Sequence, residues 1–554
     1  MALPPNMVKA VYRESAIVQY RGNPFIEALP STLSVKQVKA GLTGSVHYDL
    51  KDIFAEGRDR AHMIASLLDD FFQPLASHVL LEEKLSIMIR KGYVGRNLED
   101  GSLNTHMQNG YERIMTGDLD VFRFHQVKST ASSSLLIGCS GSGKSTSLDR
   151  ILSTYPQVIF HEDHNFTQVV HLKVDCPHDG SLKSLCIHFF RALDRVLHTD
   201  YETKYVKKRH GIETLLAQMS QVANAHAIGV LVIDEIQHLS RKRSGGVDKM
   251  LNFFVTLVNT IGLPVVFVGT PKARPIFEED LRSGRRGAGF GSLLWEPMKP
   301  PTQIIDSATG TSRITEWKAF TDKLWTYQWL QKRDEVLMDD IRDCWFDLSQ
   351  GVLDIVVKLF VLAQLRAIVT GVERITINIL NKVYEDELKP VHPMLAALRS
   401  GDPERIAEFS DLMIPDIDTK LLKLTAAIKP PWSSAATSDP YQGNSQALRL
   451  HSLLISMDFE SEAIVPLVRR VVEEHPELAT KDLVSIALKW YESDEKPHSK
   501  KRPKTKSVPQ KDWHTLESDD LRFMYSQADK KSLHAHLSKN SVIFNLEDWL
   551  NKAG

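Results

Sequence analysis

The feature that most constrains the fold of this chain is a short glycine-rich loop. Residues 138–145 read GCSGSGKS and fit the pattern G-x-x-x-x-G-K-[ST] at every fixed position. Glycines let backbone amides curl around phosphates, Lys144 can reach the β- and γ-phosphates, and the Ser145 hydroxyl can ligate Mg²⁺. An apolar run precedes the loop and a helical pattern, 145–152, follows it. We therefore predict a site for ATP and Mg²⁺, with nucleotide contacts from Gly138, Ser140, Gly141, Ser142, Gly143, Lys144, Ser145 and Thr146.

The surrounding pattern predicts an α/β fold. Short apolar runs alternate with amphipathic segments between about residues 130 and 300, as expected for a parallel sheet covered by helices. The runs are 134–137, 169–174, 230–233, 264–268 and 293–295. Residues 313–412 then read as helices only, and the segment 352–365 is apolar nearly all round, which indicates a deeply buried helix. Four tryptophans near helical spacing are expected in the core of this part: Trp317, Trp325, Trp329 and Trp345.

An acidic pair ends one of the apolar runs. Asp234 and Glu235 follow the run 230–233, about 90 residues after the glycine-rich loop. We expect Asp234 to hold Mg²⁺ through water and Glu235 to polarise the attacking water as a general base. Acidic pairs after apolar runs are common, so the prediction of a metal ligand and a base depends on the place of this pair, after the glycine-rich loop in the same α/β region. The adjacent glutamate favours an ATPase over a small-molecule kinase, whose acceptor needs no water-activating base.

Two further signals follow the acidic pair. Thr270 stands after the run 264–268, where its side chain could orient the water or merely cap the strand. Arg282, Arg285 and Arg286 lie beyond it on a glycine-rich segment. An arginine supplied across a subunit interface stabilises transition-state charge, and Arg285 or Arg286 is the stronger candidate. The alternative for these arginines is a solvated charge cluster.

Taken together, these motifs resemble the AAA+ ATPases, and longer strings are similar to the TnsC family, the ATPase regulators of Tn-seven-type transposons. The strings are NPFIEALP (23–30), GYVGRN (92–97), QNGYERI (108–114), LLIGCSGSGKS (135–145), LVIDEIQHLSR (231–241), GTPKAR (269–274), ELKPVHPML (387–395) and DWHTLESDDLRFMYSQ (512–527). The resemblance implies an AAA+ P-loop NTPase with a parallel-sheet core, a helical lid and mainly α-helical N- and C-terminal extensions.

The resemblance also implies a function and partners. Such proteins assemble as ATP-dependent homo-oligomeric rings or filaments on double-stranded DNA. They relay target choice from a target-selector protein to the transposase, and hydrolysis helps to disassemble the ring. The C-terminal tail would engage the endonuclease subunit of the transposase, and the N-terminal region would face the selector. One departure concerns the lid: where many AAA+ lids place an arginine three residues after a glycine, Gly351 is followed by Asp354, with Lys358 a turn later.

These readings divide the chain into segments with expected roles. They are a partner-facing region (1–125), the ATPase core (126–300), the lid (313–412), a linker (428–445), a small helical unit (446–493), a basic linker (494–512) and a transposase-binding segment (513–554).

A DNA contact is expected between the second and third apolar runs. Residues 201–210 read YETKYVKKRH, and four basic side chains beside two tyrosines suit sequence-independent phosphate contacts. The candidates are Lys204, Lys207, Lys208 and Arg209. A solvated helix end is the alternative.

Charge and composition limit the remaining possibilities. The chain has 68 Lys+Arg against 69 Asp+Glu, which excludes a uniformly basic nucleic-acid coat but not local basic patches. Its four cysteines cannot form a disulfide framework, and its apolar runs are too short to span a membrane. We expect a cytoplasmic bacterial protein, nucleoid-associated when bound to DNA. Two alternatives remain at this point: an AAA+ replication initiator or helicase loader, and a nucleotide-gated scaffold with little turnover.

Overall fold

The computed structural model describes residues 4, 6–116, 130–239, 253–260, 262–274, 291–300, 304–305, 312–313, 315–411, 417–428, 441, 444–457, 459, 461–493, 513–514, 523 and 525–526. The chain divides into a unit of residues 1–484 and a unit of residues 485–554.

A five-stranded sheet forms the centre of the nucleotide-binding part. Its strands are β2 (Ser133–Ile137), β5 (His171–Asp175), β6 (Val230–Asp234), β7 (Val265–Gly269) and β8 (Ser292–Leu294). They run in the order β5-β6-β7-β2-β8, and every neighbouring pair is parallel. The predicted parallel sheet is therefore confirmed. The order brings the carboxyl ends of β2, β7 and β6 side by side, so the glycine-rich loop, Thr270 and the acidic pair meet at one edge.

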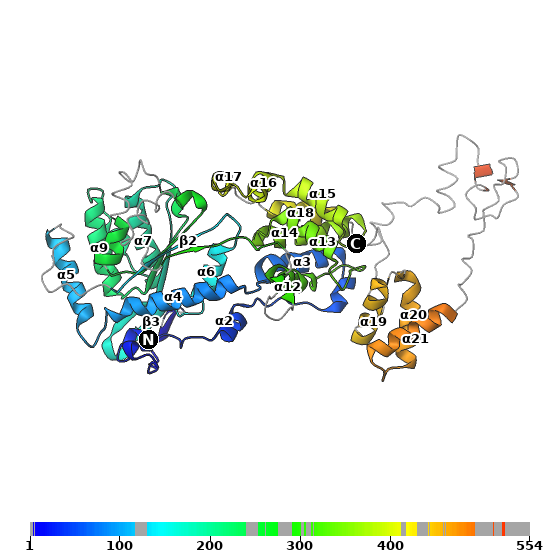
Figure 1. The fold of residues 1–554 in the computed structure, drawn as a ribbon, viewed down its shortest axis with the longest axis horizontal. Helices are drawn as coiled ribbons and strands as arrows, with labels where there is room; N and C mark the ends of the chain where they lie inside the picture. The colour runs from blue at the N-terminus through cyan, green and yellow to red at the C-terminus, as the bar shows by residue number, and fades with distance from the viewer. Residues whose placement is uncertain are drawn as a thin grey trace, which may run out of the picture. The chain divides into compact units, whose positions relative to one another are not determined.

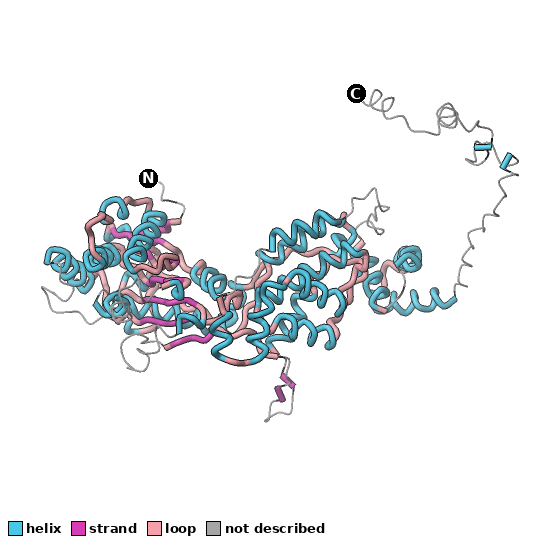
Figure 2. Tube along the Cα trace, turned by 90° about the horizontal axis from the view of Figure 1, so that it is seen from above, coloured by secondary structure: helices cyan, strands magenta, loops and turns pink. Residues whose placement is uncertain are grey.

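The two faces of the sheet are both covered by helices, as its continuous apolar strands require. Alternate residues point to opposite faces: Leu231 and Ile233 share a core with α7 (Leu182–Leu197) and α9 (Ile212–Ala225). Val230 and Val232 share another core with α4 (Ala76–Val94) and α6 (Lys144–Leu152). Figure 1 shows α7 and α9 on one side of the strands and α4 on the other, and Figure 2 shows the strands side by side in magenta.

One predicted strand is two strands. The run 169–174 splits into β4 (Phe166–Val169) and β5, which lie in different sheets. Strand β4 pairs with β3 (Val158–His161), and β3 also pairs with the N-terminal strand β1 (Met7–Lys9). The prediction of a single strand is wrong because Val170 lies between the two: its amide donates to the carbonyl of Gln157 at 2.9 Å. A continuous apolar run carries no signal for such a change of partner.

A helical part follows the sheet in sequence. Its helices are α12 (Glu316–Trp325), α13 (Asp339–Ser349), α14 (Leu353–Thr370), α15 (Ile377–Glu387), α16 (His392–Ser400), α17 (Pro403–Phe409) and α18 (Ile417–Ala427). Helix α14 is buried on nearly every side, as its sequence predicts, and Gly371 at φ +70° ends it. The four tryptophans predicted in this core are all buried there.

The N-terminal residues contribute to both cores. Helix α3 (Gly57–Asp70) packs against α14 in the helical part, whereas α4 packs on the sheet. Helix α5 (Ser102–Thr116) packs on α9. Helices α3, α4 and α5, within the expected partner-facing region 1–125, are therefore part of the framework that supports the site, which the sequence does not reveal.

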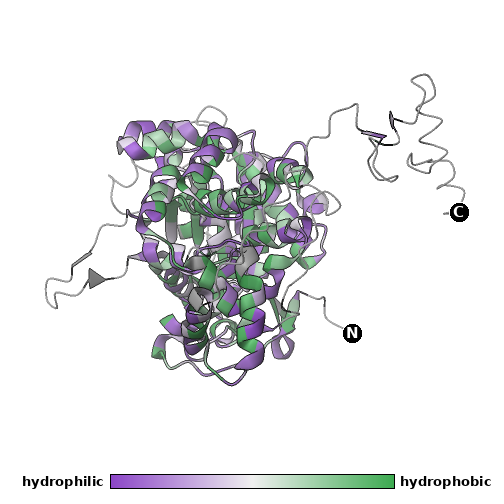
Figure 3. Cartoon of the chain, turned by 90° about the vertical axis from the view of Figure 1, so that its right-hand side faces the viewer, coloured by the Kyte–Doolittle hydropathy of each residue, from purple (hydrophilic) through white to green (hydrophobic). Residues whose placement is uncertain are grey.

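The remaining described elements are short or lie toward the C-terminus. They are α1 (Pro24–Glu27), α2 (Val35–Leu42), α8 (Tyr201–Tyr205), β9 (Ile304–Ile305), β10 (Ser312–Arg313), α19 (Ser445–Ser456), α20 (Ser461–Glu474) and α21 (Thr480–Ser493). Figure 3 shows hydrophilic and hydrophobic residues sharing the surface of many helices, as expected for helices packed on one side. Within the described ranges, no helix is long and apolar enough to cross a bilayer.

Candidate nucleotide-binding site

The glycine-rich loop connects β2 to α6 and needs its glycines. Gly141 and Gly143 have φ of +73° and +88°, a region that only glycine adopts readily. A side chain at Gly143 would also approach the Cδ1 atom of Leu353 to 3.3 Å. The loop therefore holds its backbone amides ready at the N-terminus of α6, where the helix dipole favours anions.

Lys144 is buried and turned back onto this loop. Its ammonium donates to the carbonyls of Gly138 and Cys139, both at 2.8 Å. Burial lowers the pKa of Lys144, an effect opposed by Cys139 and by the charges of Glu235, Asp234 and Asp411. The ammonium is thus held by two loop carbonyls, and three nearby carboxylates favour its charged form.

Ser145 and Asp234 come together as the sequence predicts for a metal site. The Ser145 hydroxyl donates to Oδ2 of Asp234 at 2.7 Å, and Asp234 is buried. Lys173, on β5, lies 3.2 Å from the same carboxylate. A hydroxyl and a carboxylate are oxygen ligands of the kind that Mg²⁺ prefers, so these two residues fit the ion.

Glu235 has a backbone conformation that is uncommon for a side chain of its type. Its φ is +55°, directly after β6, and its carboxylate accepts a hydrogen bond from the side-chain amide of Gln237. The oxygen of the same Gln237 amide accepts from the backbone N–H of Thr270 at 3.1 Å. Gln237 therefore links Glu235 to Thr270. Sequence reasoning missed it, although its place two residues after the acidic pair was a signal.

A second missed residue reaches Thr270 from the helical part. The Thr270 hydroxyl donates to the carboxylate of Asp411, which also pairs with Lys272 at 3.0 Å. Beside it, the carbonyl of Ser410 accepts from the N–H of Ser140 in the glycine-rich loop at 2.9 Å. Asp411 is distant in sequence from the glycine-rich loop, the acidic pair and Thr270, so the patterns around them could not have indicated it.

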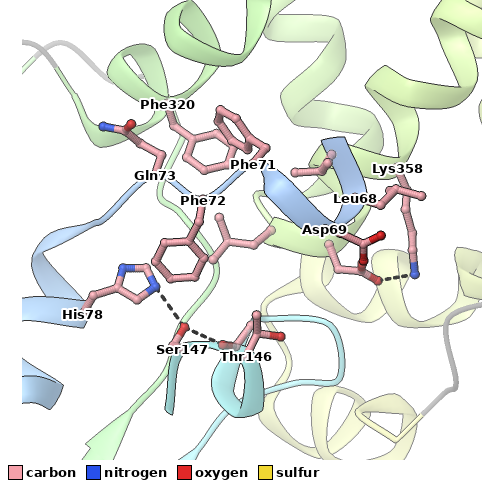
Figure 4. A pocket seen from close by; sticks show the side chains of 14 residues that line it. Leu68, Asp69, Phe71, Phe72, Gln73, His78, Thr146, Ser147, Phe320 and Lys358 are labelled. Atoms are coloured by element: carbon pink, nitrogen blue, oxygen red, sulfur yellow. Dashed lines mark hydrogen bonds and ion pairs between the residues drawn. The ribbon is translucent and has the colours of Figure 1, made fainter. Parts of the chain in front are cut away.

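A cavity of about 320 Å³ adjoins the loop. Phe71, Phe72 and Phe320 line its apolar side, and Gly143 and Thr146 line the side toward α6. Figure 4 shows the aromatic rings above Ser147, with Lys358 at the far side. A volume in this range suits a small organic ligand. Because the cavity continues from the phosphate loop, it can take the base and sugar of a nucleotide.

The helical part also touches the loop directly. The backbone N–H of Asp354 donates to the carbonyl of Gly141 at 3.0 Å, and the Asp354 carboxylate pairs with Lys358 at 2.7 Å. Asp354 stands where many AAA+ lids carry an arginine, and Lys358 stands a turn later. In this chain the two side chains pair with each other.

His78, which sequence reasoning also missed, supports the loop from α4. The N–H of Leu75 donates to Nδ1 of His78 at 2.8 Å, so the proton of the neutral ring lies on Nε2. Nε2 is 2.9 Å from the Ser147 hydroxyl, which in turn donates to the carbonyl of Gly143 (Figure 4). This chain of hydrogen bonds ties α4 to the first turn of α6.

We expect acid to destabilise the chain through this ring. Burial lowers the pKa of His78 from 6.5 to about 4. Because the unfolded chain takes up the proton first, stability is complete above pH 6.5 and falls as the pH drops toward 4, by about 3 kcal/mol for this group. The melting temperature of His78→Gln should therefore fall less between pH 7 and pH 4.5 than that of wild type. The control is a substitution of an exposed histidine, His164→Gln, whose melting temperature should fall as much as that of wild type. An equal loss in His78→Gln and wild type would contradict the prediction.

The four candidate DNA-contacting residues are all exposed on and after α8. The carboxylate of Asp194, on α7, accepts from the first-turn amides of Tyr201 and Glu202 and so fixes α8. Lys207 donates to the carbonyl of Thr203 at 2.8 Å, and the Lys204 ammonium lies 5.2 Å from the Tyr205 ring centre. Arg282, Arg285 and Arg286 lie outside the described residues.

Two family models match the chain. Residues 127–277 match a model described as an AAA domain. Residues 508–553 match a model described as the Tn7 transposition regulator TnsC. The first supports NTPase activity, and the second covers the C-terminal stretch whose sequence is similar to the TnsC family. No curated protein matches the chain.

Several solved structures are also similar. The Walker-type ATPase of Pyrococcus abyssi is 13% identical and covers 58% of this chain and 88% of its own, with a TM-score of 0.30. The ORC2 protein of Aeropyrum pernix is 14% identical and covers 52% of this chain and 68% of its own, with a TM-score of 0.28. The RuvB Holliday junction branch migration motor of Thermotoga maritima is 16% identical and covers 59% of this chain and 94% of its own, with a TM-score of 0.26. TM-scores this low carry no argument about this chain.

Proposed function

Because this chain is a TnsC-like AAA+ protein, with an AAA domain and a TnsC-type C-terminal segment, we propose that it is an ATP-dependent DNA-binding regulator of transposition. It assembles on double-stranded DNA, links a target-selector protein to the transposase, and uses ATP hydrolysis to control assembly. The observation that carries the proposal is the TnsC match in a chain whose glycine-rich loop, acidic pair and Thr270 meet at one sheet edge.

Each site residue has a role in this reaction. Lys144 and the loop amides bind the phosphates, and Ser145 and Asp234 hold Mg²⁺, which neutralises phosphate charge when bound. Glu235 accepts a proton from the attacking water, and Thr270 orients that water. Arg285 or Arg286 acts on the γ-phosphate of a neighbouring subunit. The hydrogen bond between the Ser145 hydroxyl and the Asp234 carboxylate supports the metal assignment, because it shows that the two candidate ligand oxygens lie next to each other.

The partner-facing roles follow the segments of the chain. Residues 513–554 bind the transposase and its endonuclease subunit, and the TnsC match over 508–553 supports this. The basic linker 494–512 tethers this segment and raises its effective concentration near the partner. Residues within 1–125 face the selector, while Lys204, Lys207, Lys208 and Arg209 contact DNA phosphates.

The direct test is whether DNA binding requires ATP. Wild type should bind a duplex of arbitrary sequence with ATP and Mg²⁺, measured by fluorescence anisotropy, and bind it weakly without nucleotide. Lys144→Ala should lower ATP affinity by about 10- to 100-fold, the worth of a charged hydrogen-bonding group, and lose the ATP-dependent DNA binding.

The exposed Lys36→Ala, on α2, serves as the control and should behave as wild type. DNA binding that is the same with and without ATP in wild type would contradict the proposal.

A further inference from the structure

The phosphate end of the site already holds an acidic residue of this chain. Helix α17 packs against the turn 271–273, and the two residues after it reach the site. Asp411 accepts a hydrogen bond from the Thr270 hydroxyl and pairs with Lys272. Ser410, fully buried, accepts from the Ser140 amide. These contacts use groups that a bound nucleotide would need.

The donors that Ser410 and Asp411 engage, the Ser140 amide and the Thr270 hydroxyl, belong to the part of the site assigned to the terminal phosphate. Ser140 is a loop amide assigned to phosphate, and Thr270 is assigned to the attacking water beside the γ-phosphate. The charge of Asp411 also acts on Lys144, the side chain assigned to the β- and γ-phosphates. A carboxylate resembles one edge of a phosphate: it is anionic and accepts hydrogen bonds from the same donors.

A triphosphate and this carboxylate cannot share these donors. The Thr270 hydroxyl has a single hydrogen, which it donates to the Asp411 carboxylate. The Ser140 amide has a single hydrogen, so it can serve either the Ser410 carbonyl or a phosphate oxygen. Binding of ATP therefore requires the segment after α17 to leave.

We infer that Ser410 and Asp411 form an autoinhibitory latch, in which Asp411 stands in for the terminal phosphate and holds the end of α17 on the nucleotide site. ATP binds by displacing the latch, and this releases α17 from Thr270. The chain thereby converts nucleotide binding into a movement of the helical part. The inference rests on the proposed ATP site.

The latch reduces the apparent affinity for ATP, because only the unlatched fraction can bind. Asp411→Asn removes the charge with almost no change of shape. It should raise the affinity for a non-hydrolysable ATP analogue with Mg²⁺ by about tenfold, as expected for loss of a charged hydrogen-bonding contact. The matched control is Glu408→Gln, an equal charge change on the exposed side of α17, which should bind as wild type does.

Hydrogen exchange on the wild-type chain tests the same inference without a substitution. On saturation with the analogue, the amides of residues 403–411 should exchange faster than in the nucleotide-free chain. Lys144→Ala treated in the same way should show no change.

The outcomes separate the latch from the ATP site itself. If wild type binds the analogue but Asp411→Asn binds it no more tightly, or if residues 403–411 keep their protection when nucleotide is bound, the latch is wrong and the ATP site stands. If neither wild type nor Asp411→Asn binds the analogue, the proposed ATP site fails and the latch fails with it.

Discussion

Glu235→Gln should lower the rate of ATP hydrolysis about 10²- to 10⁴-fold, the usual contribution of a general base. The amide keeps the shape of the side chain but cannot accept the proton of the attacking water. Binding of ATP should persist, because Lys144, Ser145 and Asp234 are unchanged. Under the proposed function, assembly needs ATP and disassembly needs hydrolysis, so the variant should remain on duplex DNA as a stable oligomer. Phosphate release and sedimentation of DNA-bound protein measure the two effects.

The matched control is Glu213→Gln, an exposed glutamate in the first turn of α9, which should hydrolyse ATP at the wild-type rate. Hydrolysis by Glu235→Gln close to the wild-type rate would remove Glu235 from the role of base. If wild type itself shows no turnover with or without DNA, the nucleotide-gated scaffold is the better description.

Charge reversal of the basic residues around α8 should weaken ATP-dependent DNA binding by at least about 10³-fold at moderate salt. The variant replaces Lys204, Lys207, Lys208 and Arg209 by glutamate. The effect should be large because each substitution both loses a phosphate contact and adds a repulsive charge. The salt dependence of the residual binding should also become shallower, because fewer counterions are released. Affinity for ATP should not change.

An equal charge reversal elsewhere controls for the change in net charge. The exposed set for it is Lys36, Lys39, Lys51 and Arg58. This control should keep most of the DNA affinity. A four-fold reversal around α8 that leaves DNA affinity unchanged at low salt would show that these residues are a solvated helix end.

Sequence patterns predicted much of the sheet and most of the assigned site. The loop, the acidic pair and Thr270 each follow an apolar strand directly, so the parallel sheet brings them to one edge whatever else the chain does. The buried tryptophans were also predictable, because apolar residues at helical spacing must face a core. The break at Val170 was not, because a change of pairing partner leaves the hydrophobic pattern unaltered.

The residues that sequence reasoning missed act over long separations. Gln237 links Glu235 to Thr270 only because β6 and β7 are neighbours. His78 reaches Ser147 because α4 and α6 pack on the same face of the sheet. Histidines are common on helices, and nothing in its local sequence distinguishes His78, whereas the place of Gln237 two residues after the acidic pair was a signal.

The sequence by itself determined where the candidate chemistry lies: a glycine-rich phosphate-loop motif and an acidic pair, each directly after an apolar strand, since such motifs depend on a few residues at fixed spacing. The tertiary structure alone decided what surrounds that chemistry. Residues 57–94 support both cores, and Ser410 and Asp411 contact Ser140 of the glycine-rich loop and Thr270. Such contacts arise from the packing of apolar faces far apart in the chain, and that packing is set by shape and burial over the whole fold rather than by any local pattern.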